Sequence, residues 1–599
     1  MSRPQSPVQV PAPRLGVVID EQATRAAHAA GDDAWWLYAT EVLGHAGLDH
    51  RRLGSVPAEL ADLDVLIIAS PQRLAAESVR ALDGWLTAGG TLIITAVVPE
   101  LDGLAGVAVG PARIEDTVTL ADDPTWTTRP ELPLRGIGGR VLASAEGAEV
   151  LAGWSDGAAA VVRKRHGDGT VISYGVDLWR TIVTIQQGYP VAGDGKPAPD
   201  GTAPIDDGIL KCEDGMALDY ADRVLPPGEP ELAADFTHSY PPPSAVPIFS
   251  TAQADQWWIT LLQQIWAAHD HRRQASAWLH YWPAGVPAIA HMSHDADGNV
   301  EEDGLAALEA FAEAEVAVTW CQVFPGGYSP ELYAKIGEAG HEQALHYNAM
   351  GDADLANWGW PQFRAQHAWA QAVTGTDAIV SNKNHYTRWE GWTEFYTWCE
   401  RVGIKIDESR GPSKQGTVGF PFGTAHLSFP IGDLSVHNRP MDVLNLPLHT
   451  QDLAWAGHLA CRDVILDGAE AVHGVAHFLF HGPHLRGKPA TRASCPEVAR
   501  LARERGMEWW TAGQLSEWER ARRGVRVTIT EDADGWLVAV ESEQPIARAG
   551  LVLQLPGADQ APSAATEGAT VSEVTRHGRR FHELAVDLPA GSSSWRITR

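Results

Sequence analysis

The first third of the chain alternates between two hydrophobic patterns that together predict an α/β domain. Continuous apolar runs predict buried strands at 15–20, 63–70 and 91–96. Apolar residues recur at helical spacing over 34–46 and 75–88, between these strands. This order of strands and helices predicts a doubly wound sheet of parallel strands with helices on its faces.

The remainder of this region continues with weaker patterns. Residues 158–174 predict a hairpin, because two β-rich flanks enclose the turn Gly167-Asp168-Gly169. From 184 to 243 the composition is that of loops and linkers. Paired apolar residues over 252–269 predict a helix that closes the domain, which we place at 1–275.

Short apolar strands then alternate with helices over the region 276–522. The predicted strands are 288–294, 316–323, 342–347, 377–384, 404–407, 442–448 and 475–481, with helices such as 304–315 and 362–374 between them. This alternation predicts a (β/α) barrel, a fold that places functional side chains at the C-terminal ends of its strands.

The last region, 523–599, has only strand patterns. Residues 525–529 and 536–540 alternate on either side of Asp534-Gly535, a hairpin signal, and three more strands fit 549–555, 580–588 and 594–598. Several short antiparallel strands predict a small β-sandwich. A structural cap is the favoured role, and carbohydrate binding is the alternative.

One segment of the barrel region lacks periodicity. Residues 411–438 are rich in Gly, Pro and Phe. A long insertion between barrel elements is typical of a lid or binding loop, so we expect selectivity to lie there. Trp358, Trp360, Trp389 and Trp392 are the aromatic candidates for the same cleft, with helix packing as the alternative.

Composition narrows the classes of partner. The 599 residues include 76 acidic and 46 basic side chains, a net charge of −30, which would repel nucleic acid and anionic membranes. We find no signal peptide and no stretch long and apolar enough to span a bilayer, so a cytoplasmic protein is expected. Five cysteines without a CxxC pair fit that reducing compartment. The 24 tryptophans exceed what packing needs, and a few are expected to line a site.

Polar side chains follow the predicted barrel strands at their C-terminal ends. They are Asp295 and Asp297, His346 and Asn348, His385 and Arg388, Asp407 and Ser409, His449, and His481 and His484. A divalent cation can take one carboxylate and two imidazoles while leaving positions open for water and a carbonyl oxygen. A second carboxylate then serves as the base and another imidazole protonates the leaving amine. The set therefore favours a metal-dependent hydrolase.

These segments resemble the polysaccharide deacetylase family, also called NodB-like or carbohydrate esterase family 4, at the branch whose first motif is His-Asp-x-Asp. The matching segments are 294–297, 340–346, 384–389, 403–409 and 478–481. The resemblance implies that Asp295 is the general base, oriented by Arg388, and that His481 is the general acid. It also implies that Asp297 and His346 bind the metal ion.

The chain departs from the family pattern at the second imidazole ligand. That ligand usually stands four residues after the first, where this chain has Met350, a poor partner for a hard divalent ion. We expect His385 to replace it, with Asn348 as the alternative, and Zn²⁺ to be the ion. Asp407 is expected to form an ion pair with Arg388 or another cation.

Each assignment also has a structural alternative. An Asp-x-Asp-Gly segment is common in solvated turns. A lone His at a strand end is more often a hydrogen-bonded structural residue, so His426, His437, His449 and His484 stay unassigned. Arg388 can equally be a surface charge, and His481 can be a buried structural imidazole.

The first region resembles the class I glutamine-amidotransferase-like fold, through the segments LDVLIIAS, AGGTLIITA and GDGTVISYGVDLWRTI. That family needs a nucleophilic Cys on a tight turn between strand and helix. No Cys precedes Cys212, which lacks the flanking glycines. We therefore expect this domain to be silent in amidotransferase chemistry.

The sequence as a whole predicts a three-domain α/β protein: a doubly wound domain, a (β/α) barrel of the deacetylase type and a β-sandwich. The expected activity is metal-dependent hydrolysis of an amide C–N bond in an N-acylated sugar or glycan. A hydrolase of a small cyclic amide or N-acyl amine is one alternative, and a non-catalytic carbohydrate-binding protein is another. The expected partner is a small-molecule or oligosaccharide substrate, and a homo-oligomer is left open.

Overall fold

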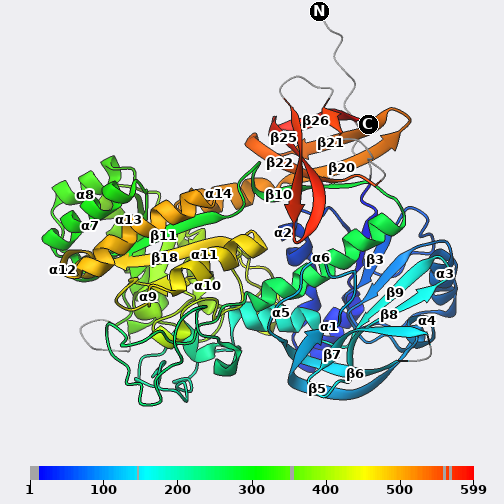
Figure 1. Ribbon diagram of the computed structural model, residues 1–599, viewed down its shortest axis with the longest axis horizontal. Coiled ribbons are helices and arrows are strands. Elements are labelled where there is room, and N and C mark those ends of the chain that lie inside the picture. The colour runs from blue at the N-terminus through cyan, green and yellow to red at the C-terminus, as the bar shows by residue number, and fades with distance from the viewer. Residues whose placement is uncertain (1–11, 145–146, 351–356, 557–561, 565–568) are drawn as a thin grey trace, which may run out of the picture.

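Four sheets and the helices around them form the protein (Figure 1). The computed structural model describes residues 12–144, 147–350, 357–556, 562–564 and 569–599. In Figure 1 the first region lies at the lower right, the second at the left and the C-terminal strands at the top. Among the described residues, no helix combines the length and hydrophobicity that crossing a bilayer requires.

The first region is built on a mixed nine-stranded sheet in the order β2-β1-β3-β4-β9-β8-β6-β5-β7. Its strands are β1 Leu15–Val18, β2 Arg51–Leu53, β3 Val65–Ile68, β4 Thr91–Ile94, β5 Val107–Leu120, β6 Leu134–Ser144, β7 Ala148–Trp154, β8 Ala159–His166 and β9 Gly169–Tyr174. Its helices are α1 Glu21–Ala30, α2 Ala39–His45, α3 Ala76–Thr87, α4 Asp102–Ala105, α5 Leu178–Gln187 and α6 Gln253–His271. The five strands from β2 to β9 pair in parallel, as the apolar runs predict, and β8 and β9 form the predicted hairpin.

The antiparallel extension of this sheet is not in the prediction. Strands β5, β6 and β7 pair in antiparallel fashion beyond β8. Most side chains of β5 are exposed or half-buried, so its sequence has no continuous apolar run. A strand with so little buried surface leaves a weak pattern.

The second region is an arc of parallel strands in the order β16-β15-β14-β13-β12-β11-β18-β17, with β19 paired to β11. The strands are β11 Ile289–Asp295, β12 Thr319–Val323, β13 Glu342–Tyr347, β14 Ser381–Asn384, β15 Ile406–Asp407, β16 Leu444–Asn445, β17 Thr450–Gln451, β18 Val475–His481 and β19 Glu508–Trp509. No pairing within the described chain joins β16 to β17, so the sheet is a half-barrel.

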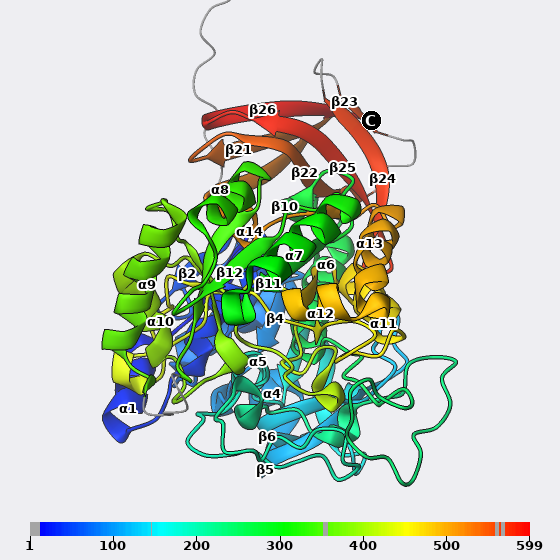
Figure 2. The same cartoon turned by 90° about the vertical axis from the view of Figure 1, so that its left-hand side faces the viewer.

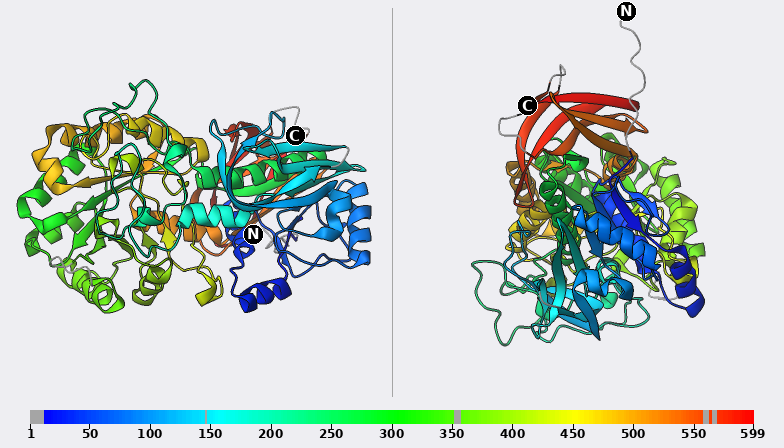
Figure 3. Two further views of the ribbon diagram at one scale, coloured as in Figure 1. Left: turned by 90° about the horizontal axis from the view of Figure 1, so that it is seen from below. Right: turned by 90° about the vertical axis from the view of Figure 1, so that its right-hand side faces the viewer.

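Helices surround the convex face of this arc (Figures 2 and 3). They are α7 Glu301–Ala314, α8 Pro330–Glu338, α9 Trp360–Thr374, α10 Glu394–Val402, α11 Cys461–Val472, α12 Gly482–Gly487, α13 Pro489–Glu504 and α14 Ala512–Arg523. Along β11, His294 contacts the ring of Trp320 and faces this helical layer with Phe311. Because side chains alternate along a strand, His291, Ser293 and Asp295 point into the barrel instead.

The C-terminal strands form two four-stranded sheets, β10-β22-β25-β24 and β20-β21-β26-β23. Their bounds are β10 Ser276–Pro283, β20 Val525–Asp532, β21 Gly535–Ser542, β22 Ile546–Gln554, β23 Ser563–Ala564, β24 Thr570–Arg576, β25 Arg579–Leu588 and β26 Gly591–Thr598. Strand β10 lies in the range that the sequence assigns to the barrel region, but it pairs with β22. It does so because Leu279 and its partner Leu551 bury each other in the apolar core between the C-terminal strands.

Helix α6 connects the three regions and carries few exposed residues. Trp257 donates its indole N–H to the carbonyl of Arg135 in β6, and Asp255 accepts the backbone N–H of Ala425. At the other end, the side chain of Gln554 in β22 donates to the carbonyl of Trp266. In Figure 1 the helix crosses the molecule between the first region and the C-terminal strands.

The expectation of a lid at 411–438 is wrong, because the segment is interior. Its residues from 415 to 432 are almost all buried. Phe420 donates its backbone N–H to Phe249, and Gly423 packs so closely on Ile185 that a Cβ there would lie 2.3 Å from that side chain. The apolar residues of this segment pack against the first region and do not form a cleft.

Candidate metal centre and active site

The C-terminal ends of β11, β13, β14 and β18 bring five of the predicted side chains together. Asp295 is the last residue of β11, and Asp297 follows in a turn that Gly298 makes with a φ of 74°. His346 lies in β13, and His385 comes directly after β14. His481 ends β18 and is in register with Asp295. The parallel strands therefore deliver all five to one edge of the half-barrel.

Asp297, His346 and His385 form a compact set that we call the open centre. Asp297 Oδ1 lies 3.4 Å from His346 Nε2 and 3.2 Å from His385 Nδ1, and the two nitrogens are 3.0 Å apart. The side chains of Asp297 and His385 are 31% and 16% exposed, so small molecules can reach them. Burial favours the neutral acid, but the two imidazoles hold the pKa of Asp297 well below its usual range.

The donor set of the open centre fits a divalent cation. His346 Nδ1 lies 2.9 Å from the carbonyl oxygen of Lys383 and donates its proton there, which leaves Nε2 as the nitrogen that faces Asp297. Asp297 Oδ1 is buried, and none of its contacts with the described residues has hydrogen-bond geometry. A carboxylate and two imidazoles that converge in this way are a ligand set of catalytic Zn²⁺ sites.

Asp295 lies beside the open centre and is held by cations. Its Oδ2 lies 3.1 Å from Lys383 Nζ, 3.5 Å from His346 Nε2 and 3.7 Å from His481 Nε2. Burial acts to raise the pKa of Asp295, but His346, Lys383 and His481 together lower it below its ordinary value. Asp295 is thus an ionised carboxylate whose Oδ1 is buried without a hydrogen-bond partner among the described residues.

His481 is held by a second carboxylate, Asp452, which follows β17. Asp452 accepts the backbone N–H of His481 at 2.9 Å, and its Oδ2 lies 2.6 Å from His481 Nδ1 and 2.8 Å from His484 Nδ1. His481 Nε2 faces Asp295 and Asp297, each at 3.7 Å. Burial opposes a charged ring, but Asp452 and the two aspartates raise the pKa of His481 to about 9. A protonated imidazole therefore points into the site.

Two predicted residues have other surroundings. Arg388 is buried and forms an ion pair with Glu390, and its role as the residue that orients Asp295 stays a prediction. The predicted ion pair of Asp407 is wrong, because Asp407 accepts hydrogen bonds from Asn382 and Ser409. Burial raises the pKa of Asp407 to about 6, so neutral donors suffice to hold it.

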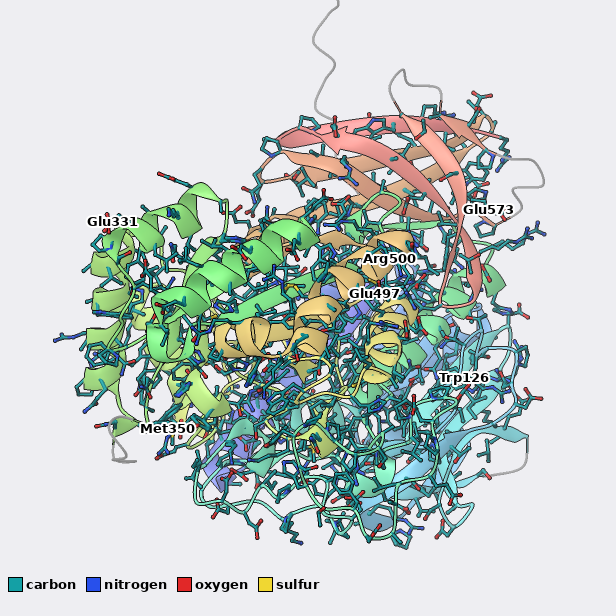
Figure 4. The ribbon with its side chains drawn as sticks, turned by 60° about the vertical axis from the view of Figure 1, so that its left-hand side comes forward. Trp126, Glu331, Met350, Glu497, Arg500 and Glu573 are labelled. Carbon is teal, nitrogen blue, oxygen red and sulfur yellow. The ribbon has the colours of Figure 1, made fainter. Side chains whose placement is uncertain are left out.

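The alternative ligands in motif two lie apart from the cation ligands. Asn348 donates to the carbonyl of Phe324 and accepts the backbone N–H of Met350. Met350 lies at the outer edge of the second region (Figure 4). Between His385 and Asn348, the two candidates for the remaining metal ligand, His385 is the one that contacts Asp297, with Nδ1 3.2 Å from Oδ1.

Two of the four tryptophans considered for the cleft, Trp389 and Trp392, are core residues, and Trp358 and Trp360 are half-buried. Trp389 is fully buried, and Trp392 donates its indole N–H to the carbonyl of Gly188 in the first region. The aromatic rings beside the site are others. Tyr386 is 53% exposed with its ring 4.6 Å from that of His385, and Trp455 lies 5.5 Å from the ring of His484.

Lys383 and Asp452 belong to the site but are absent from the sequence prediction. Lys383 lies two residues before His385 in the polar strand Ser381–Asn384, and strand alternation was the signal that could have found it. Asp452 lies just after a two-residue strand, too short to leave a hydrophobic pattern. For Asp452 the sequence carries no signal of its pairing with His481.

Comparisons with known proteins give only distant likenesses. No protein-family model and no curated protein sequence matches this chain. A structure described as a polysaccharide deacetylase from Mycobacterium smegmatis aligns with 40% of this chain and 93% of its own, at 16% identity and a TM-score of 0.30. The β-galactosidase from Bacillus circulans sp. alkalophilus aligns over 30% of this chain and 31% of its own, at 16% identity and a TM-score of 0.25.

A third likeness is to an exo-β-1,4-mannosidase from Opitutaceae bacterium strain TAV5, which covers 28% of this chain and 32% of that one, at 16% identity and a TM-score of 0.22. The alignments with the two glycosidases thus span about a third of the length of those proteins.

Proposed function

We propose that the protein is a metal-dependent hydrolase of amide C–N bonds, and that its substrate is an N-acylated sugar or glycan. The observation that carries the proposal is the placement of a base and an acid on the same cation site. Asp295 faces the ligand His346 and His481 faces the ligand Asp297, and each is held by a partner outside the ligand set, Lys383 and Asp452 respectively.

The reaction adds water across the amide. A divalent ion on Asp297, His346 and His385 would polarise the acyl carbonyl and lower the pKa of a water molecule. Asp295 removes a proton from the attacking water, and Lys383 keeps its carboxylate ionised for that step. His481 donates a proton to the departing nitrogen. The C–N bond breaks as a C–O bond forms, and the products are a carboxylate and an amine.

The support for a sugar substrate comes from the aromatic rings beside the site. Tyr386 is largely exposed next to His385, and Trp455 stands next to His484, the neighbour of His481 on Asp452. Flat aromatic faces are common stacking surfaces for sugar rings. Tyr386, exposed beside His385, is therefore the ring on which the sugar of an N-acylated substrate would stack, whereas the ring of Trp455 already contacts Tyr240 and Lys488.

The experiment that tests this proposal is the substitution Asp295→Asn. We expect turnover of N-acetylhexosamine oligomers to fall about 10³-fold, with zinc content unchanged, because the variant loses the base and keeps every ligand. Release of acetate is measured on these oligomers and on small cyclic amides. The matched control is Asp64→Asn, which removes a buried carboxylate that pairs with Arg14 and Arg272 in the first region.

Full activity in Asp295→Asn would refute the role of the base. Hydrolysis of small amides with no action on the oligomers would keep the C–N hydrolase and refute the sugar substrate. A chain that hydrolyses neither class after loading with zinc would refute the proposed activity.

A further inference from the structure

A second cluster of metal-binding side chains lies inside the half-barrel, below the open centre. His291 in β11, His477 in β18 and Glu408, which follows β15, converge there with side chains that have no exposed surface. Glu408 Oε2 lies 3.0 Å from His291 Nε2 and 3.4 Å from His477 Nε2. Ser293 Oγ lies 2.8 Å from His477 Nε2. Barrel interiors are ordinarily filled by branched apolar residues, so a polar cluster here needs a reason.

The hydrogen bonds of the two imidazoles fix their orientation. His291 Nδ1 lies 2.8 Å from the carbonyl oxygen of Trp510, and His477 Nδ1 lies 3.1 Å from that of Pro447. A carbonyl oxygen only accepts, so each Nδ1 carries a proton, and Nε2 is the nitrogen of each ring that faces Glu408. His346 in the open centre is oriented in the same way by the carbonyl of Lys383. This outward hydrogen bond is typical of imidazoles that bind metal ions.

Two further observations point to a cation between these groups. Glu408 Oε1 is buried and has no hydrogen-bond partner among the described residues. The separations of 3.0 and 3.4 Å between Glu408 Oε2 and the two Nε2 atoms also bracket the edge of a tetrahedron of ligands around Zn²⁺, which is about 3.3 Å for bonds of about 2.0 Å.

An ion pair between a protonated His291 and Glu408 is the metal-free alternative. It uses one carboxylate oxygen and leaves Oε1 without a donor. In that alternative Ser293 Oγ, 2.8 Å away, donates to His477 Nε2, so Glu408 Oε1 is the polar atom that stays unsatisfied among the described residues. Taking a charge out of water is costly unless all its polar atoms are satisfied. A divalent ion satisfies both imidazoles and the carboxylate together.

We propose that His291, Glu408 and His477 bind a structural Zn²⁺ ion, and we call this set the clasp. Ser293 Oγ or Glu408 Oε1 supplies the fourth donor. The proposal goes beyond the hydrolase activity, because a site without exposed surface admits no substrate. The bound ion would link strands near the two ends of the half-barrel sheet.

The clasp connects the two ends of the open arc. Glu408 follows β15, the second strand from one end, and His477 lies in β18, the second strand from the other. No pairing of the described strands joins β16 to β17. A bound ion would therefore link the two ends of the sheet through the barrel interior, where no hydrogen bonds between β16 and β17 of the described chain join them. Because the ligands are fully buried, the ion enters while the chain folds.

The test counts zinc in the full chain expressed in zinc-supplemented medium. Elemental analysis is expected to give two ions per chain in the wild type and one in His477→Gln. His346→Gln, which removes a ligand of the open centre, is expected to keep one. The matched control is His449→Gln, a buried imidazole that accepts the backbone N–H of His477 and donates to Thr424, and it is expected to keep two.

A direct measurement does not depend on whether the variants fold. Anomalous diffraction at the zinc edge from wild-type crystals is expected to show a peak among His291, Glu408 and His477. Absence of that peak overturns the clasp. So does a single ion that His346→Gln loses and His477→Gln keeps. The reverse result, a single ion kept by His346→Gln and lost by His477→Gln, supports the clasp and counts against the cation of the proposed hydrolase.

Discussion

The open centre and the clasp contain the same kinds of donor, two imidazoles and one carboxylate, but they differ in access. Two ligands of the open centre are 31% and 16% exposed, whereas all three of the clasp have no exposed surface. Both centres contain an imidazole whose Nδ1 is bound to a backbone carbonyl, so its Nε2 faces the carboxylate. Donor chemistry therefore does not distinguish the proposed catalytic centre from the proposed structural one, but their solvent access does.

The neighbours of the two centres differ as well. Asp295 and His481 stand on the open centre and are held by Lys383 and Asp452. The side chain within hydrogen-bond distance of His477 Nε2 in the clasp is the neutral hydroxyl of Ser293. An ionised base and a protonated imidazole can move protons for a substrate, and a buried serine hydroxyl cannot. We therefore expect the open centre, which has both solvent access and charged neighbours, to be the catalytic one of the two.

The largest difference expected between the two centres is in the rate of metal release. A chelator reaches the open centre from solvent, whereas release from the clasp needs the barrel interior to open. An opening cost of about 4 kcal/mol slows release by about 10³. We expect EDTA to remove one zinc ion and all activity within minutes, while the second ion stays until the chain unfolds. Zinc in the protein fraction is measured over time after rapid desalting.

Denaturant provides the control for this experiment. In urea that unfolds the chain, both ions are expected to leave at the same rate. Release of the clasp ion is expected to coincide with the loss of the far-ultraviolet circular dichroism signal. Two ions that leave the native protein at the same rate would break the comparison, because the clasp would then be as open as the catalytic centre.

A smaller effect is expected from Asp452→Asn, which changes the charged second layer and no metal ligand. Asp452 accepts from the backbone N–H and the Nδ1 of His481, and an amide cannot accept all of these bonds. Misorientation of the general acid is expected to lower turnover about 10²-fold. Turnover is measured on amides with good and poor leaving amines. A variant that slows both equally would indicate that His481 does not protonate the amine.

The sequence predicted the open centre better than the clasp, for a physical reason. Asp295, Asp297 and His346 follow apolar runs at the ends of strands, where polar side chains stand out. His291 and His477 lie within such runs, four residues before Asp295 and His481. A period of two places each pair on the same face of its strand, so this signal was available. Glu408 has no such signal in the sequence, because the strand that precedes it, β15, is only two residues long.

The fold divides in a similar way. The parallel strands β1, β3 and β4 are buried on both faces, and continuous apolar runs predict them. The pairing of β10 with β22 joins residues about 270 positions apart, such as Leu279 and Leu551. Local periodicity predicts a strand at either place but cannot choose its partner. The burial of 411–438 depends in the same way on the first region, which packs against it.

The smallest expected effect concerns Asp255, a buried carboxylate in helix α6. Its hydrogen-bond donors are neutral, in contrast to the charged neighbours of the carboxylate Asp295. Asp255 accepts from the backbone N–H of Ala425 and the indole of Trp258, and burial raises its pKa to about 7. The folded chain thus holds a proton that the unfolded chain releases near pH 4. The contribution of this proton to the free energy of unfolding is complete below pH 4 and is lost as the pH rises towards 7, by at most about 1.4 kcal/mol per pH unit.

Asp255→Asn, whose side-chain oxygen can still accept from Ala425, is expected to flatten that slope in urea unfolding between pH 5 and 7. Equal slopes for variant and wild type would mean that Asp255 is ionised when buried, and that a buried carboxylate in this protein needs no cation.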